Sequence, residues 1–121
     1  MKGKIPKNIK LFLEKRRFLK KPTKIEKQMI DIIERNNLPF KYVGDNQFFV
    51  GIKNPDFINI NGQKIAIEVR NRKVCQIYDK CSFEEYKQKR IDYFQKFNWK
   101  CFVFSENELN PQEIIETIRG V

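Results

Sequence analysis

The chain has 121 residues and a mass of 14.7 kDa, which suits one compact domain and is too short for two. Hydrophobic residues make up 40% of it and charged residues 33%, so we expect a core to form and do not expect wholesale disorder. The sequence has no apolar run long enough to cross a bilayer and no apolar signal core at its amino terminus. We therefore expect a cytoplasmic protein with no membrane contact.

The net charge of +10 is concentrated at the amino terminus. Residues 1–24 hold ten Lys or Arg and one acid, whereas the remainder holds fifteen basic and fourteen acidic residues. Such a block indicates a polyanionic partner, of which nucleic acid is the commonest, although a solvated tail has the same composition. We divide the chain into a basic arm or helix over 1–22 and a domain over 23–121.

Three cysteines, Cys75, Cys81 and Cys101, are an odd number without disulfide spacing, which favours a reducing compartment. The chain has no histidine, so a zinc site would need all three thiols and an acid. The composition therefore argues against structural zinc.

The first half of the chain predicts two helices and then strands. Residues 8–20 have a loose amphipathic pattern, and Thr23 begins a helix that should end near Asn36. The apolar positions of this second helix recur at helical spacing at Ile25, Met29, Ile32 and Ile33. Residues 38–53 surround the turn signal Gly44-Asp45-Asn46 and are interpreted as a strand or hairpin.

A second hairpin is predicted over 56–60 and 64–70, joined at Asn61-Gly62, and its register is open. A three-residue loop places Asp56 opposite Glu68, with Cβ atoms about 5 Å apart. A two-residue turn instead pairs Asp56 with Ile67 and sends Glu68 to the other face. Side-chain apolarity slightly favours the second register, which pairs Ile58 with Ile65.

The second half predicts helix, strand, helix. Residues 71–80 are polar and irregular and are interpreted as a loop; Ser82 with Glu85 is a capping box opening a helix to about Phe97. Cys101 to Phe104 is a short buried strand, and Asn110 with Pro111 starts the last helix. The fold class is therefore α/β, with a small mixed β-sheet of about four strands flanked by helices.

Two acidic residues are the candidates for chemistry. On a strand, Glu68 and Arg70 point to one face while Ile67 and Val69 point to the other. If Asp56 lies opposite Glu68, the two carboxylates can hold one divalent cation of the kind used in phosphodiester hydrolysis. The alternative from the bare residues is a surface aspartate and a glutamate that forms an ion pair with an arginine.

The segments Asn54-Pro55-Asp56-Phe57 and Ile67-Glu68-Val69-Arg70 resemble the PD…(D/E)XK signature of restriction-type nucleases and archaeal Holliday-junction resolvases. Arg70 stands where that signature has lysine. The stretches KPTKIEKQM, LPFKYVGDNQFFVGIKNPDFININGQKIAIEV and RIDYFQKFNWKCFVFSENEL are similar to very-short-patch-repair (mismatch-nicking) endonucleases and related phage and intron-associated homing nucleases. The resemblance implies a restriction-endonuclease-like core over most of residues 20–109.

The resemblance also implies roles for residues of this chain. Glu26, Asp56, Glu68 and Arg70 would be catalytic, and the metal ligands would be Asp56, Glu68 and the Val69 carbonyl. The cation would be Mg²⁺, with Mn²⁺ as a substitute. Those relatives carry a histidine general base after the glutamate strand, and this chain has none. The base would then be metal-activated water, a lysine such as Lys73, or absent.

Two of these residues have alternative explanations. Glu26 forms a capping box with Thr23, which needs no catalytic duty. Arg90 falls on the apolar stripe of its helix and needs a partner, either one of the two acids or a substrate phosphate. We expect DNA contacts from eight basic residues: Lys15, Arg16, Arg17, Lys20, Lys21, Arg72, Lys73 and Arg90.

Three functional hypotheses follow. The first is a Mg²⁺-dependent DNA endonuclease, nicking or cutting both strands, in repair, recombination or homing. The second is a DNA-binding module on the same fold that has lost catalysis with the histidine. The third is a Holliday-junction resolvase, which would act as a homodimer.

Overall fold

The computed structural model describes residues 21–120, so the predicted helix over 8–20 and nearly all of the basic arm lie outside the described residues. Its helices and strands are, in chain order, α2 (Lys24–Arg35), β1 (Phe40–Tyr42), β2 (Phe57–Asn59), β3 (Ile65–Val69), α3 (Arg72–Val74), α4 (Phe83–Gln95), β4 (Lys100–Phe104) and α5 (Pro111–Arg119). A π-helical turn, η1 (Cys75–Asp79), follows α3, and a 3-10 turn, η2 (Glu106–Glu108), precedes α5.

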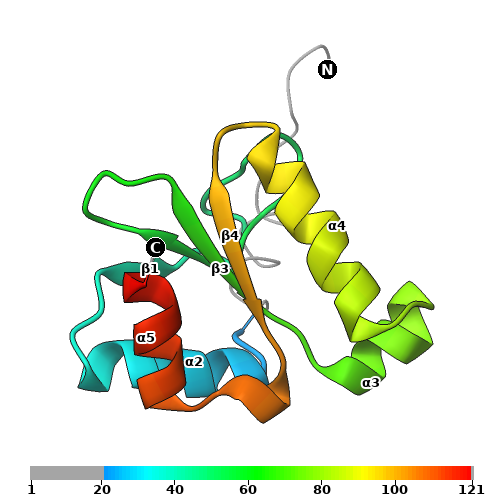
Figure 1. Cartoon of the computed structure of the whole chain (residues 1–121), viewed down its shortest axis with the longest axis horizontal. Helices are drawn as coiled ribbons and strands as arrows, with labels where there is room; N and C mark the ends of the chain where they lie inside the picture. The colour runs from blue at the N-terminus through cyan, green and yellow to red at the C-terminus, as the bar shows by residue number, and fades with distance from the viewer. Residues whose placement is uncertain (1–20, 121) are drawn as a thin grey trace, which may run out of the picture.

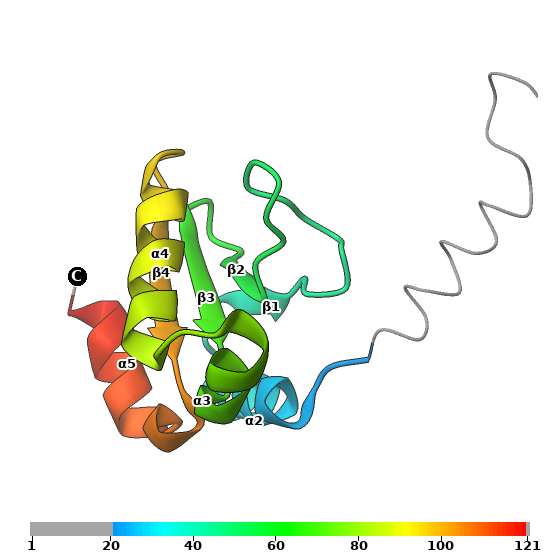
Figure 2. The ribbon, with the colours of Figure 1, turned by 90° about the vertical axis from the view of Figure 1, so that its right-hand side faces the viewer.

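The sheet lies between two layers of helices (Figures 1 and 2). Its strand order is β1-β2-β3-β4; β1 with β2 and β2 with β3 are antiparallel, whereas β3 and β4 are parallel. The parallel pair needs a crossover, which α4 supplies on one face, while α2 and α5 cover the other. The predicted α/β fold with a small mixed sheet of four strands flanked by helices is therefore confirmed.

The alternation of β3 divides the core in two. Ile67 and Val69 pack with α2 and α5 in one buried cluster, whereas Ala66 packs beneath α4 in the other. Glu68 is two residues after Ala66 and so points to the same face of the sheet. Only 1% of its surface is exposed. A carboxyl group is therefore enclosed between the sheet and α4.

The predicted helix starts are confirmed by their capping contacts. The Glu26 N–H donates to Thr23 Oγ1 at 3.3 Å, and the Thr23 N–H donates to Glu26 Oε1 at 2.8 Å. Ser82 and Glu85 form the same box at 3.1 and 3.0 Å. The helix that Ser82 starts ends at Gln95, two residues before the predicted Phe97.

The register of the β2–β3 hairpin pairs Phe57 with Ile67 and Ile58 with Ala66. The loop therefore uses three residues, 61–63, and Asp56 lies opposite Glu68. The register that side-chain apolarity favoured, with Ile58 opposite Ile65, is wrong. The reason is the buried Asn59 side chain, whose Oδ1 accepts from the N–H groups of Asn61 at 2.7 Å and Gln63 at 3.2 Å.

Two other local predictions are corrected. Of the strand or hairpin predicted over residues 38–53, the strand forms as β1, which pairs with β2; the hairpin does not form, and residues 43–56 are a long loop. The predicted loop over 71–80 contains α3 and η1, started by the Asn71 side chain, which accepts from the Lys73 and Val74 N–H groups. Over the described residues, no helix combines the length and apolarity that crossing a membrane requires.

We predict that Asn59→Ala lowers the free energy of unfolding by about 1–2 kcal/mol, because the two loop N–H groups lose their acceptor. Urea denaturation measures the effect. Asn61→Ala is the matched control, because that exposed side chain precedes the turn glycine and should change stability by less than about 0.5 kcal/mol. Equal stability of Asn59→Ala and the parent would show that other contacts set the register.

Candidate active site

A cleft of about 630 Å³ opens where the start of α2, the 43–56 loop, the end of β3 and α4 meet. Charged side chains from distant parts of the chain line it. The acids are Glu26, Asp56, Glu68 and Asp79, and the bases are Lys21, Lys53, Arg70, Lys89 and Arg90. The cleft therefore brings all four predicted catalytic residues together, along with Val69.

Asp56 is fixed at the floor of this cleft by backbone contacts. Its carbonyl accepts from the Val43 N–H at 2.8 Å, and its Oδ2 accepts from the Val69 N–H at 2.9 Å. Burial, and then the nearby charges of Glu68 and Glu26, raise the pKa of Asp56 well above its ordinary value. The folded chain therefore holds a carboxylate whose negative charge is poorly compensated.

Asn54 organises the loop that delivers Asp56. Its Nδ2 donates to the carbonyls of Val43 and Phe48, both at 2.7 Å, and its Oδ1 accepts from the Asn46 N–H at 3.2 Å. These bonds tie the two ends of the 43–56 loop together. The asparagine before the Pro-Asp pair thus acts as a positioning residue for the aspartate.

Glu68 is held by α4. Arg90 donates from Nε to Oε1 at 2.9 Å and from an Nη to Oε2 at 2.6 Å, and the Tyr86 hydroxyl donates to Oε1 at 3.3 Å. Burial raises the pKa of Glu68, while Arg90 and Tyr86 oppose that rise. Of the partners considered for Arg90, the structure gives it Glu68, as a two-pronged ion pair.

Glu26 forms the predicted capping contact and also lies beside the acids of the cleft. Its Oε1 caps the Thr23 N–H and accepts from the Tyr42 hydroxyl at 3.3 Å. The same carboxyl group raises the pKa of Asp56 through its charge and a hydrogen bond. The capping glutamate is therefore also part of the acidic group in the cleft.

Arg70 lies in the cleft but is bound by a residue that the sequence did not single out. Its guanidinium group donates to both carboxylate oxygens of Asp79 on η1 at 2.9–3.1 Å. It also lies 5.1 Å from the centre of the Tyr86 ring. Any contact between Arg70 and a substrate phosphate would have to compete with Asp79.

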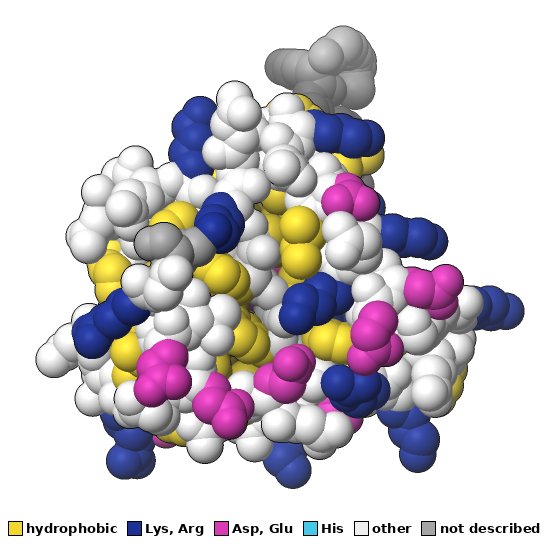
Figure 3. All heavy atoms as spheres, in the orientation of Figure 1, with side chains coloured by type: hydrophobic (Ala, Val, Ile, Leu, Met, Phe, Trp, Pro, Cys, Tyr) yellow, Lys and Arg dark blue, Asp and Glu magenta, His cyan; other side chains and the backbone are white. Residues whose placement is uncertain are grey.

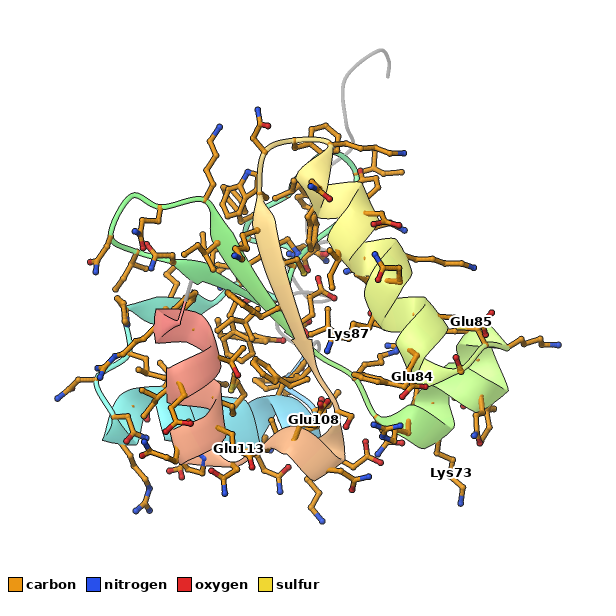
Figure 4. All side chains as sticks on the ribbon, viewed as in Figure 1. Lys73, Glu84, Glu85, Lys87, Glu108 and Glu113 are labelled. Carbon is orange, nitrogen blue, oxygen red and sulfur yellow. The ribbon has the colours of Figure 1, made fainter. Side chains whose placement is uncertain are left out.

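The other predicted DNA contacts divide by location. Lys21 lies on the cleft, whereas Lys15, Arg16, Arg17 and Lys20 lie outside the described residues. Arg72 does not line the cleft; it donates to Glu84 and Ser105 and lies over the Phe83 ring. Lys73 is exposed on α3 and points away from the body of the protein (Figure 4), so it is not placed to act as a base in the cleft.

Two cleft lysines, Lys53 and Lys89, were missed by the sequence reasoning. Lys89 had a detectable signal, because Tyr86, Lys89 and Arg90 have the i, i+3, i+4 spacing of one helix face. Lys53 lies in an irregular loop and had none. Among residues 21–120, the ion pairs closer than 4.0 Å do not involve Lys21, Lys53 or Lys89. Lys53 instead holds its Nζ 5.5 Å from the centre of the Tyr93 ring.

The donor set fits a hard divalent cation. Asp56 and Glu68 offer carboxylate oxygens, and a cation would relieve the repulsion that raises the pKa of Asp56. A carboxylate has about four acceptor positions, and three on Glu68 are used, leaving one on Oε2. Within residues 21–120 no three His, Cys, Asp or Glu side chains form a ready metal cage, so backbone, water or substrate oxygens would complete the shell.

Comparison with solved structures gives one similar fold. The catalytic domain of the homing endonuclease I-Bth0305I superposes with a TM-score of 0.52 and 18% sequence identity, over 81% of this chain and 91% of that domain. No protein-family model and no curated protein sequence matches the chain. The similarity supports the nuclease-like fold and, at this identity, does not extend to activity.

We predict that Asp56→Asn raises the free energy of unfolding at neutral pH, without divalent metal, by on the order of 1 kcal/mol. The charge of Asp56 opposes folding above its raised pKa, so removing that charge is stabilising. The gain should shrink as the pH falls toward about 3.9, where the unfolded aspartate also becomes protonated.

Chemical denaturation across pH measures this effect. The matched control is Asp31→Asn, which removes only an exposed pair with Arg35 and should change stability by less than about 1 kcal/mol. A variant less stable than the parent at neutral pH would show that the Asp56 carboxylate stabilises the fold.

We predict that Arg90→Gln lowers the free energy of unfolding by about 3 kcal/mol, because Glu68 is left buried without its counter-charge. Arg35→Gln, which breaks the exposed pair on α2, should cost less than about 1 kcal/mol. Thermal and urea unfolding of both variants test the contrast. Similar small losses would mean that Glu68 finds other partners.

Proposed function

We propose that this chain is a metal-dependent DNA endonuclease of the PD-(D/E)XK type, related to the very-short-patch-repair and homing nucleases. The observation that carries the proposal is the register of the β2–β3 hairpin, which sets Asp56 opposite Glu68 beside a third acid, Glu26. Structural similarity to a homing endonuclease catalytic domain supports the assignment. DNA is therefore the proposed substrate.

In this proposal Asp56, Glu68 and the Val69 carbonyl hold Mg²⁺, with Mn²⁺ as a substitute. The cation, when bound, supplies the positive charge that phosphodiester hydrolysis needs at the attacked phosphate. Asp56 is oriented for this task by the Val69 N–H, and Glu68 by Arg90. Glu26 orients water at the edge of the acidic group, where it already contacts Tyr42.

The phosphate would enter past the three lysines of the cleft. Lys21, Lys53 and Lys89 can contact backbone phosphates, and such contacts position a duplex without reading its sequence. Arg70 would steady the attacked phosphate after releasing Asp79. The chain has no histidine and Lys73 does not line the cleft, so of the bases considered the proposal retains water activated by the cation.

Catalytic impairment is the second candidate, and one observation favours it. Both oxygens of Glu68 are already bound by Arg90, which leaves this carboxylate little capacity for a metal ion. On this reading the fold and the basic segment bind DNA, and hydrolysis is lost.

Supercoiled plasmid incubated with Mg²⁺ or Mn²⁺ separates the two candidates. We expect the parent to produce relaxed or linear DNA, and Asp56→Ala to reduce the rate at least about 100-fold, as for loss of an essential metal ligand. The matched control, Asp31→Ala, removes an exposed acid on α2 and should cut at the parental rate.

Equal cutting by the parent and Asp56→Ala would remove the endonuclease assignment. Plasmid binding without cutting by the parent would support the impaired module instead. The product also decides between nicking and double-strand cleavage, because relaxed circles require one cut strand and linear molecules require two.

A further inference from the structure

The ion pair between Arg70 and Asp79 joins a fixed arginine to an acid on a weakly anchored turn. Arg70 follows β3, its N–H donates to the Phe104 carbonyl at 3.0 Å, and its guanidinium group lies 5.1 Å from the centre of the Tyr86 ring. The Tyr86 hydroxyl in turn donates to the buried Glu68 at 3.3 Å. The arginine is therefore held by contacts that do not involve Asp79.

Asp79 is the last residue of η1, and this turn has few anchors. The two residues before it, Ile77 and Tyr78, are 57% and 75% exposed, and only Cys75, at the start of the turn, is buried. Lys80 follows with a φ of 54°, a left-handed conformation that strains a residue other than glycine. Figure 2 shows the turn between α4 and α2. Little apolar packing therefore opposes a movement of the Asp79 side chain.

The contact with Asp79 occupies one whole side of the guanidinium group. Arg70 Nε donates to Oδ2 at 3.1 Å, and one Nη donates to Oδ1 at 3.0 Å and to Oδ2 at 2.9 Å. A phosphate group offers two oxygens to an arginine in the same two-pronged arrangement. Asp79 and a phosphate therefore cannot occupy this side of Arg70 at the same time.

The two ion pairs of the cleft differ in how readily the acid can leave. Arg90 pairs with Glu68, whose side chain is 2% exposed, whereas the Asp79 side chain is 27% exposed. Release of Glu68 would leave a buried charge without its counter-ion, which is strongly unfavourable. Water can solvate Asp79 once it leaves Arg70, so this second pair is the one that an incoming anion can open.

We propose that Asp79 is an internal competitor of the substrate: its carboxylate occupies the phosphate site of Arg70, and DNA must displace it to reach that site. The inference rests on the proposed function, because it takes a DNA phosphate as the ligand of Arg70. Only the fraction of the protein in which Asp79 has released the arginine can make this contact. The ion pair therefore lowers the apparent affinity for phosphate by that fraction.

This competition favours ligands that carry many phosphates. A single phosphate that displaces Asp79 gains the Arg70 contact alone, whereas a duplex can also contact Lys21 and Lys89 on the cleft. Over α3 and α4, Figure 3 shows basic and acidic side chains of the described residues mixed together, without a continuous basic patch. That face offers DNA little attraction of its own, so the contact with Arg70 is expected to matter for binding.

Fluorescence anisotropy of a labelled duplex measures the competition when divalent metal is omitted, so that no metal-dependent hydrolysis occurs. We expect Asp79→Asn to bind the duplex roughly five- to tenfold more tightly than the parent, because the half-buried pair no longer masks Arg70. Asp79→Ala should give a similar gain. Loss of a negative charge attracts DNA in any case, so Asp79→Asn is also made in Arg70→Gln. There we expect a gain of at most about twofold, because no arginine is unmasked.

Asp92→Asn is the matched control for charge. It removes an exposed acid of α4 that does not line the cleft, and affinity should stay within about twofold of the parent. Equal gains from Asp79→Asn in the parental and Arg70→Gln backgrounds would overturn the proposal, because they would reveal a general effect of charge. Weaker binding by Asp79→Asn would overturn it too, and would show that Asp79 positions Arg70 for DNA.

A second readout needs no DNA and separates this inference from the proposed function. In NMR spectra, inorganic phosphate should shift the Arg70 Nε–H resonance of Asp79→Asn at concentrations roughly five- to tenfold lower than in the parent. A parent that binds no DNA would remove the proposed function, whereas the phosphate titration would still test the competition at Arg70. Equal responses of the two proteins to phosphate would contradict the inference even for an active nuclease.

Discussion

The charge repulsion among three carboxyl groups that line one cleft is the constraint on which this structure depends. Glu68 is buried on β3, Asp56 faces it across the hairpin, and Glu26 approaches from α2. Removing a charge such as that of Glu68 from water costs several kcal/mol unless partners compensate. Much of the surrounding structure supplies that compensation: Arg90 and Tyr86 for Glu68, the Val69 N–H for Asp56, and Tyr42 for Glu26.

The negative charges of Glu68 and Asp56 are compensated to different degrees. Glu68 has a guanidinium group and a hydroxyl group within hydrogen-bond range, whereas Asp56 has a single backbone donor and two neighbouring negative charges. Burial without a matched cation is common at functional sites and uncommon in purely structural ion pairs. A divalent cation beside Asp56 would offset the excess negative charge, so the carboxylate that would bind the ion is also one that destabilises the fold while no ion is bound.

The order of helices and strands was predictable because it depends on local signals. Capping boxes at Thr23 and Ser82 and the apolar spacing of α2 and α5 occur within a few residues. Such signals did not decide the hairpin register. The Asn-Gly dipeptide suits a two-residue turn, whereas the Asn59 side chain accepts from two N–H groups of the loop and so favours a three-residue loop. The pairing of β1 with β2 across a fourteen-residue loop, and the contact of Arg70 with Asp79, depend on tertiary contacts and left no pattern in the sequence.

Most of the chain's excess positive charge lies in residues 1–24 and not among the side chains that line the cleft. The described cleft holds five basic and four acidic side chains, so its own field attracts a polyanion only weakly. Residues 1–24 carry ten basic residues, and one of them, Lys21, lies on the cleft. If the cleft acts on DNA as proposed, non-specific affinity comes mainly from this block and depends on salt. The acidic group can then remain negative enough to attract a cation, because it need not also attract the substrate.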